Sequence, residues 1–459
     1  MKALHDFVLA VNSIVWGPPM LILLFGTHLF LTFRLKFIQR YIGLAIKLSV
    51  SKDTDGDGDV SQFGALTTAL AATIGTGNIV GVATAVALGG PGAVLWCWLT
   101  GVFGIATKYA EALLSVKYRV KTSDGTMLGG PMYALENGLN MKWLAVVFCI
   151  FTAIAAFGIG NMVQANSISS MVHESFNVSP YITGVIMAAL TAVVVIGGVK
   201  SIASVCEKLV PFMAIFYVLG CITILIMNAQ YVGAAIGLIF SSAFTTTAAG
   251  GGFVGATVMI AARYGIARGL FSNESGLGSA PIVAAAAQTK NPVRQALVSA
   301  TGTFWDTVVV CAMTGIVLVT SIVRDPAAVG GLKGAALTKA AFAQIPVVGP
   351  IVLTIGLLTF VFSTILGWSY YGERAAEYLL GKKVILPYRV LWVIGVFVGS
   401  ITSLAFVWDL ADTLNALMAI PNLVALLLLS GVIVEETKKY LWEGDINAAS
   451  TDKIRTISN

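Results

Sequence analysis

The chain has 459 residues, of which 57% are hydrophobic and only 11% are charged, and its formal net charge is +6. Soluble domains carry about 25% charged residues, whereas this chain has a mean hydropathy of +0.87 and too few charges to cover a surface that faces water. The composition excludes a cytosolic enzyme, a nucleic-acid binder and a disordered scaffold. It predicts an all-α integral membrane protein that crosses the bilayer several times.

A helix needs about 20 mainly apolar residues to cross a bilayer. Eleven stretches of the chain meet that need, and the first is long enough to stay in the membrane rather than to act as a cleavable signal. They are 14–34, 61–88, 91–116, 143–173, 179–199, 205–228, 252–287, 295–323, 346–372, 388–406 and 408–433. Two shorter stretches, 37–50 and 231–244, are expected to lie in the membrane interface.

The basic residues predict the orientation of the chain. If the loop after the first span lies inside, most of the 28 Lys and Arg residues fall in inner segments, beginning with Arg34, Lys36 and Arg40. Cytoplasmic loops carry an excess of Lys and Arg. We therefore expect a multi-pass protein of the cell membrane with its N-terminus outside and its C-terminus in the cytoplasm.

Two of the spans are interrupted by glycine and polar residues. The stretch 61–88 contains GTGNIVG, and the stretch 252–287 contains RGLFSNESGLGSAP. Each opens a set of five spans, and an odd number of spans forces the second half to be inverted relative to the first. Paired interrupted helices in two inverted halves indicate the binding site of a secondary transporter. The expected units are an extra N-terminal helix with an amphipathic segment (1–60), the first repeat (61–228), an external interfacial segment (229–251), the second repeat (252–433) and a cytoplasmic tail (434–459).

The interruptions also predict what is bound. Unwinding a helix in hydrocarbon leaves N–H and C=O groups without partners, which is costly unless they face protein or a ligand. The N-terminus of a half-helix suits a carboxylate, whereas freed carbonyls suit an ammonium group or a hard cation. One site with both kinds of helix end is complementary to a zwitterionic amino acid together with Na⁺.

Several of these residues have a second interpretation. Gly77 and Gly81 form a GxxxG pair, which often serves close helix packing. Glu274 could bind a cation, carry a coupling proton or hold the break open, and we favour the structural or gating role. Asp306 is expected to be a hydrogen-bonded brace between helices. The run DTDGDGDV at 53–60 resembles a calcium loop, but Gly64 stands where that loop has its Glu, so we expect a solvated acidic linker.

The interrupted segments carry a family resemblance. FGALTTALAATIGTGNIVGVATAVALGGPGA and RGLFSNESGLGSAPIVAAAA resemble the alanine or glycine:cation (sodium:alanine) symporter family, and GGPMYALENGL and TFWDTVVVCAMTG fit it too. The resemblance covers nearly the whole chain. It implies a LeuT-like inverted repeat of five plus five helices with one extra N-terminal helix, and transport of alanine or glycine with Na⁺ as coupling ion. Ser275 and Ala284 depart from the family pattern and leave the choice of substrate open.

The resemblance also implies substrate contacts. Backbone groups of Thr76, Gly77 and Asn78 would bind the carboxylate, and the second break would offer carbonyls to the amino group. Apart from the resemblance, Asn161 and Gln164 share a helical face and can point together, so Gln164 is expected to contact the substrate, with interhelical hydrogen bonding as the alternative. Aromatic walls would limit the substrate to a small amino acid. The second break and these walls comprise Phe271, Ser272, Asn273, Gly276 and Trp368.

By similarity with LeuT-like transporters, the sodium site would use the carbonyls of Ala71 and Ile74 and the hydroxyls of Ser363 and Thr364. Na⁺ is a hard cation that prefers oxygen ligands. The alternative is that both hydroxyls only bond back to their own helix.

The sequence thus predicts a sodium-coupled importer of small neutral amino acids that works by alternating access, with no obligatory protein partner. The alternative is a proton-coupled amino-acid or amine transporter on the same scaffold, for which Glu274 is the best support. An intramembrane enzyme would need a nucleophile with a base or a metal set, and the sequence offers no such cluster. A channel would need repeated pore-lining charge.

Overall fold

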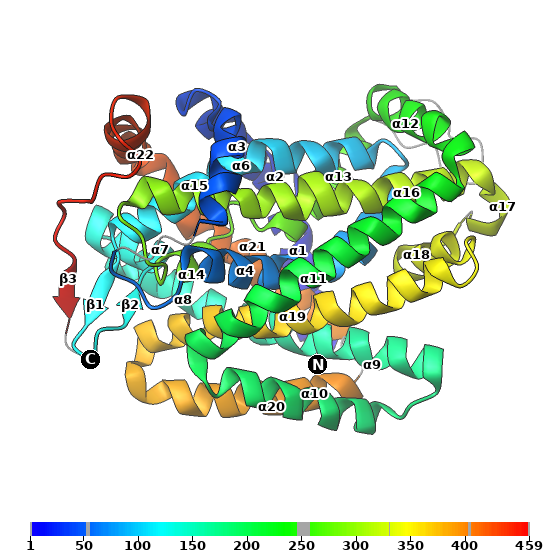
Figure 1. The fold of residues 1–459 in the computed structure, drawn as a ribbon. Helices are drawn as coiled ribbons and strands as arrows, with labels where there is room; N and C mark the ends of the chain where they lie inside the picture. Colours follow the sequence, from blue (N-terminus) through cyan, green and yellow to red (C-terminus); the bar gives the residue numbers. More distant parts are fainter. Residues whose placement is uncertain (1, 52–55, 246–257, 330, 403–404, 458–459) are drawn as a thin grey trace.

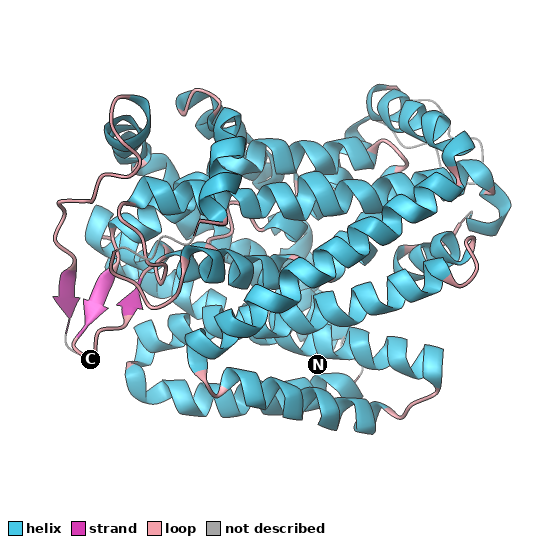
Figure 2. Ribbon diagram, viewed as in Figure 1, coloured by secondary structure: helices cyan, strands magenta, loops and turns pink. Residues whose placement is uncertain are grey.

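The computed structural model describes residues 2–51, 56–245, 258–329, 331–402 and 405–457. Helices make up almost all of it (Figures 1 and 2). The first half of the chain forms α1 (Lys2–Val15), α2 (Pro18–Arg34), η1 (Ile38–Tyr41), α3 (Ile42–Ser49), α4 (Gln62–Thr73), η2 (Gly77–Gly81), α5 (Val82–Gly89), α6 (Ala93–Lys117), β1 (Val120–Thr122), β2 (Met127–Leu128), α7 (Pro131–Tyr133), η3 (Ala134–Gly138), α8 (Lys142–Phe157), η4 (Gly158–Met162), α9 (Val163–Phe176), α10 (Pro180–Val195), α11 (Gly198–Met227) and α12 (Ala229–Phe244).

The second half begins again with a helix that leads into an interruption. It forms α13 (Val258–Asn273), α14 (Pro281–Ala284), α15 (Pro292–Thr303), η5 (Phe304–Cys311), α16 (Ala312–Arg324), α17 (Pro326–Val329), α18 (Gly334–Ala343), α19 (Val348–Leu380), η6 (Lys382–Val384), α20 (Ile385–Ile401), α21 (Ala405–Leu428), α22 (Ser430–Thr437), η7 (Lys438–Trp442) and β3 (Arg455–Ile457). The first part of the expected span 252–287, and residues 403–404 of the span 388–406, lie outside the described residues.

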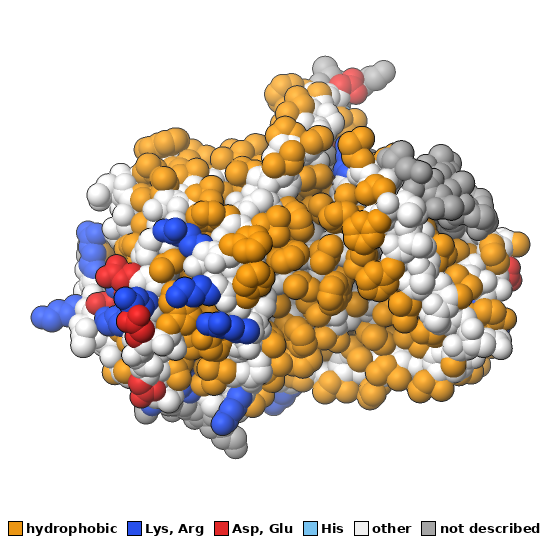
Figure 3. All heavy atoms as spheres, turned by 90° about the horizontal axis from the view of Figure 1, so that it is seen from above, with side chains coloured by type: hydrophobic (Ala, Val, Ile, Leu, Met, Phe, Trp, Pro, Cys, Tyr) orange, Lys and Arg blue, Asp and Glu red, His pale blue; other side chains and the backbone are white. Residues whose placement is uncertain are grey.

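The long helices form a bundle with an apolar outer surface. Large side chains stand exposed on its flanks, for example Val193 (79% exposed) and Ile226 (69%). Figure 3 shows hydrophobic side chains over the middle of the bundle and charged side chains gathered at the end that carries the C-terminal tail. A band of exposed apolar side chains between polar ends is what a lipid bilayer requires of a protein surface.

The expected count of eleven spans is not confirmed. Within the described residues, 7 helices are long and apolar enough to cross a membrane, or up to 9 if each of two bent pairs is one span. The bent pairs are Leu4–Val15 with Pro18–Arg34, at 41°, and Gln62–Thr73 with Gly77–Gly89, at 51°. The helices Pro180–Val195 and Ala229–Phe244 are apolar but shorter. The structure therefore supports a multi-pass membrane protein without supporting the number eleven.

The all-α expectation is confirmed for the bundle, and a small sheet at the tail end adds to it. Strand β1 pairs antiparallel with β2 and parallel with β3, so that the order is β2-β1-β3. Val120 lies opposite Arg455, and Thr122 lies opposite Ile457. Such a sheet could not be foreseen, because its strands are short and one of them comes from the far end of the chain.

Candidate functional site

The first interrupted helix breaks between α4 and η2. Ile74 leaves the helical conformation, with φ −75° and ψ 93°, and the Gly75 N–H donates to Asn78 Oδ1 at 2.8 Å. A Cβ on Gly75 would lie 2.6 Å from Thr364 Oγ1, so only glycine allows this approach to α19. The N–H groups at the start of the second half-helix, at Thr76 and Gly77, point out of a helix N-terminus.

The second interrupted helix breaks between α13 and α14. Glu274, Gly276 and Gly278 adopt left-handed backbone conformations, with φ of 55°, 92° and 88°. Two of them are glycines, which adopt this conformation without the steric cost of a Cβ. The expected break is therefore present, over Glu274–Ala280.

Two neighbouring helices satisfy the backbone of the second break. Glu111 on α6 accepts from the N–H groups of Gly276 and Gly278 at 3.0 and 3.1 Å. Asn422 on α21 donates to Glu111 Oε1 at 2.7 Å and to the Gly276 carbonyl at 2.9 Å. This corrects one expectation: the Gly276 carbonyl already has a partner, and Gly276 does not line the cavity described below.

Asp306 joins the two breaks. Its carboxylate accepts from Asn78 Nδ2 at 2.6 Å and from Ser272 Oγ at 3.0 Å. Thr307 Oγ1 donates to the same carboxylate at 2.6 Å. The expected brace between helices is confirmed, and it connects the first break, the second break and η5.

A small cavity of about 20 Å³ lies between the breaks. Predicted residues in its wall are Thr76, Gly77, Gln164, Phe271, Trp368 and Thr364; the others are Ala72, Thr73, Gly75, Ile159, Glu274 and Asn415. Trp368 is fully buried, and its indole N–H donates to Glu274 Oε1 at 3.0 Å. Glu274 Oε2 also accepts from Ser279 at 2.5 Å, so Glu274 holds the break and the aromatic wall together.

The cavity wall carries two free acceptors. Among the described residues, the buried atoms Gln164 Oε1 and Asn415 Oδ1 have no hydrogen-bond partner. Buried polar atoms are normally paired, and both residues line the cavity. They are therefore suited to accept hydrogen bonds from a bound ammonium group.

The side chains of three residues predicted to offer backbone groups to the substrate are bonded elsewhere. Asn78 and Ser272 bond to Asp306, and Asn273 bonds to Thr100 and to the Ser275 N–H. Their side chains brace the breaks and do not line the cavity.

Asn161 does not point with Gln164 as expected. It donates to the Trp392 carbonyl on α20 at 2.8 Å. It lies in the π-helical segment η4, which shifts the side-chain register between α8 and α9.

The oxygens of the predicted sodium site lie in two close pairs, and Thr364 also lines the cavity. Ser363 Oγ is 3.2 Å from the Ala71 carbonyl oxygen, and Thr364 Oγ1 is 3.4 Å from that of Ile74. Both hydroxyls also contact the Phe360 carbonyl of their own helix, at 2.8 and 2.9 Å. The four oxygens fit a hard cation such as Na⁺, because they are neutral donors from the first break and from α19.

The sequence reasoning missed Asn415 and Glu111. Both are polar residues within apolar stretches, at 1% and 3% exposure, and intramembrane polar residues are functional by default.

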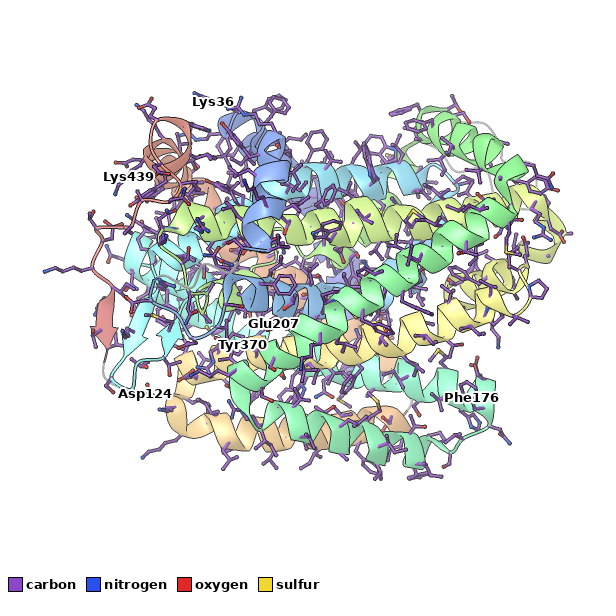
Figure 4. The ribbon with its side chains drawn as sticks, viewed as in Figure 1. Lys36, Asp124, Phe176, Glu207, Tyr370 and Lys439 are labelled. Atoms are coloured by element: carbon purple, nitrogen blue, oxygen red, sulfur yellow. The ribbon has the colours of Figure 1, made fainter. Side chains whose placement is uncertain are left out.

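Figure 4 shows Glu207, whose Oε1 accepts from Ser61 Oγ at 2.7 Å and so fixes the N-terminus of α4 on α11.

Two facing breaks inside an apolar helical bundle, with a small polar cavity between them, define a membrane transporter. The family model for the sodium:alanine symporter family matches residues 1–453, and the chain belongs to that family. It is a sodium-coupled secondary active transporter of amino acids.

Named relatives agree with this assignment. The chain is similar to the sodium/alanine symporter AgcS of Methanococcus maripaludis, with 55% identity over 95% of this chain and 97% of the relative. It is 35% identical to the probable sodium/glutamine symporter GlnT of Bacillus subtilis, over 96% of this chain and 91% of the relative. Among solved structures, MhsT in complex with L-phenylalanine has a TM-score of 0.56 and 16% identity, over 84% of this chain and 94% of that one. This likeness shows a LeuT-like transporter fold.

Proposed function

We propose that this transporter carries a small neutral amino acid, alanine or glycine, into the cell together with Na⁺. The cavity between the two breaks carries this proposal, since its wall combines a helix N-terminus with free acceptors and four oxygens lie beside it. A relative named as a sodium/alanine symporter, at 55% identity, supports alanine. The relative named as a probable sodium/glutamine symporter shows why the substrate needs a direct test.

The cavity chemistry supports a bound zwitterion. The N–H groups of Thr76 and Gly77 would bind the carboxylate at a helix N-terminus. Gln164 and Asn415 would accept hydrogen bonds from the ammonium group through their free oxygens. Phe271 and Trp368, both in the cavity wall, would enclose the side chain.

The coupling ion would bind to the carbonyls of Ala71 and Ile74 and the hydroxyls of Ser363 and Thr364. The carbonyls belong to the first break and the hydroxyls to α19, so binding would order the break against that helix. The amino acid would then close the outer path, and the inner path would open afterwards. This is alternating access, in which the site faces one side of the membrane at a time.

The proposed topology has eleven spans, in two inverted halves of five after one extra N-terminal helix. The N-terminus would lie outside and the tail in the cytoplasm of a cell-membrane protein. The charged side chains at the tail end support this orientation (Figure 3), because cytoplasmic loops carry most Lys and Arg.

Uptake of labelled alanine into proteoliposomes tests the function. We expect uptake along an inward Na⁺ gradient, loss of uptake when choline replaces Na⁺, and competition by unlabelled glycine. Undiminished uptake in choline would reject sodium coupling of alanine. A proton-coupled transporter is the second candidate, because the carboxylate of Glu274 lines the cavity.

A further inference from the structure

At the tail end of the bundle, the two interrupted helices are joined backbone to backbone. The linker 56–60 leads into α4, and residues 285–289 lead out of α14. The N–H groups of Asp59 and Val60 donate to the Ala286 carbonyl at 2.7 and 3.1 Å, and the Gln288 N–H donates to the Val60 carbonyl at 2.8 Å. Residues 53–55 of the expected linker lie outside the described residues. Gly56 and Asp57 are exposed, as expected, whereas Val60 is buried against the segment that follows α14.

Glycine makes this contact close. A Cβ on Gly58 would lie 2.3 Å from the Gln288 nitrogen, and one on Gly56 would lie 2.3 Å from the Thr289 carbonyl oxygen. These glycines belong to the run DTDGDGDV, which resembles a calcium loop. Its glycines let one backbone lie directly on another.

Arg119 ties the same two segments together from a third direction. It lies between α6 and β1 and is 7% exposed. Its Nη1 donates to the carbonyls of Ala285 and Ala287 at 3.0 and 2.9 Å, and its Nη2 donates to the Asp57 carbonyl at 3.0 Å. One guanidinium therefore spans the approach to the first break and the exit from the second. A lysine could not match this fork of donors.

The C-terminal tail reinforces the position of Arg119. The next residue, Val120, pairs with Arg455 of β3. The Ser450 N–H donates to the Lys290 carbonyl at 2.7 Å, and Asn291 Nδ2 donates to the Ile446 and Ala448 carbonyls at 2.8 and 2.9 Å. The tail is thus bound both to the strand after Arg119 and to the exit of the second break (Figure 1).

We infer that Arg119 is a positioning residue of the inner gate, which keeps the cytoplasmic path closed until its three hydrogen bonds break. The inference rests on the proposed function, because it needs alternating access and a cytoplasmic tail end. Substrate and Na⁺ can leave toward the tail only if the linker and the exit of α14 separate. Arg119 opposes that separation, and β3 holds Arg119 in place.

The test uses a cysteine at Val60, which is 7% exposed inside the joined segment. The five native cysteines are all buried, and the protein without V60C gives their background. In inside-out vesicles, we expect a membrane-impermeant maleimide to label V60C about tenfold faster or more after Arg119→Met. A tenfold change corresponds to about 1.4 kcal/mol lost from the closed state.

The matched control is Lys121→Met, which removes the same charge two residues further along. Lys121 bonds to the Asp57 carboxylate at 3.1 Å, at an exposed position, and not to the backbone of the exit. We expect the labelling rate of V60C to stay at the parent value. Equal rates in parent and Arg119→Met, or the same rise with Lys121→Met, would overturn the inference.

Arg119→Lys provides a second, milder variant. The lysine side chain keeps the charge but has one nitrogen for three carbonyls, so we expect a labelling rate of V60C between those of the parent and Arg119→Met. If Arg119→Met is not recovered as monodisperse protein, the labelling rate of Arg119→Lys is compared with those of the parent and Lys121→Met instead. The apparent KM for alanine should rise more than Vmax falls, since fewer molecules face outward. The labelling assay needs neither alanine nor Na⁺, so it is independent of the uptake assay. If Arg119→Met raises the labelling rate but the protein shows no sodium-driven alanine uptake, the proposed function is refuted and the inference about Arg119 stands.

Discussion

Replacing Thr364 by valine tests the sodium site most directly. The hydroxyl is 3.4 Å from the Ile74 carbonyl oxygen at the first break and 2.9 Å from the Phe360 carbonyl of its own helix. Valine keeps the branched shape and removes the oxygen. If the hydroxyl only bonds back to its helix, sodium activation will not change. If it is a ligand, Na⁺ loses one of its oxygen donors.

The two outcomes differ in size. A hydrogen bond between neutral groups contributes about 0.5–1.5 kcal/mol to stability, whereas a polar contact to a charged group contributes about 1.5–3 kcal/mol. The larger range corresponds to about a 10- to 150-fold rise in the Na⁺ concentration that gives half-maximal uptake. We expect this rise together with only a small decrease in thermal stability.

The assay is the initial rate of alanine uptake into proteoliposomes at varied Na⁺ concentration. Thr359→Val is the control, because Thr359 lies on the same helix and donates to the Ile355 carbonyl at 2.7 Å. We expect this control to activate like the unmodified protein. The reasoning is refuted if Thr364→Val leaves the sodium activation curve in place, or if both variants shift it equally.

Three further changes test the brace, the aromatic wall and the buried carboxylate. Asp306→Ala removes the carboxylate that accepts from the Asn78 amide and the Ser272 hydroxyl, and leaves them only weaker contacts to the Asp306 backbone carbonyl and Cys311 Sγ. It should lower the free energy of unfolding by about 1–3 kcal/mol. Asp306→Asn should cost less in a thermal melt, and equal melts would argue against the brace. Gly160→Ala places a Cβ 2.2 Å from the Cβ of Trp368, which forms part of the cavity wall, and should abolish alanine binding in a titration. Gly26→Ala is the control and should bind alanine normally, because its Cβ meets nothing within 4 Å. Glu274→Gln should keep the dependence of uptake on Na⁺ and on pH, and a flattened pH profile would favour proton coupling.

The positions of both breaks could be predicted from the sequence. Glycines and polar residues cannot continue a helix through hydrocarbon without a reason, and the chain leaves the helix at Ile74 and again after Asn273. The brace at Asp306 was also predictable, because a lone carboxylate in an apolar stretch needs donors. The four oxygens of the sodium site were chosen through a family resemblance, and the fold brings them together.

Side-chain direction was harder to predict. Asn161 and Gln164 share a face of an ideal α-helix, but η4 is π-helical and turns Asn161 toward α20. The partners of the second break, Glu111 and Asn422, come from distant helices. No local pattern states which of several intramembrane polar residues will meet.

By itself, the sequence determined that this chain is a membrane protein and at which residues its helices are interrupted. It also determined that these interruptions suit a zwitterion with a cation. These follow from local chemistry, since hydropathy and backbone satisfaction act over one or two turns of helix. Only the tertiary structure decided that Asn415 completes the cavity wall and that Arg119 joins the ends of both interrupted helices. Those contacts depend on how the helices cross and on where the tail strand pairs, and packing of the whole chain sets both.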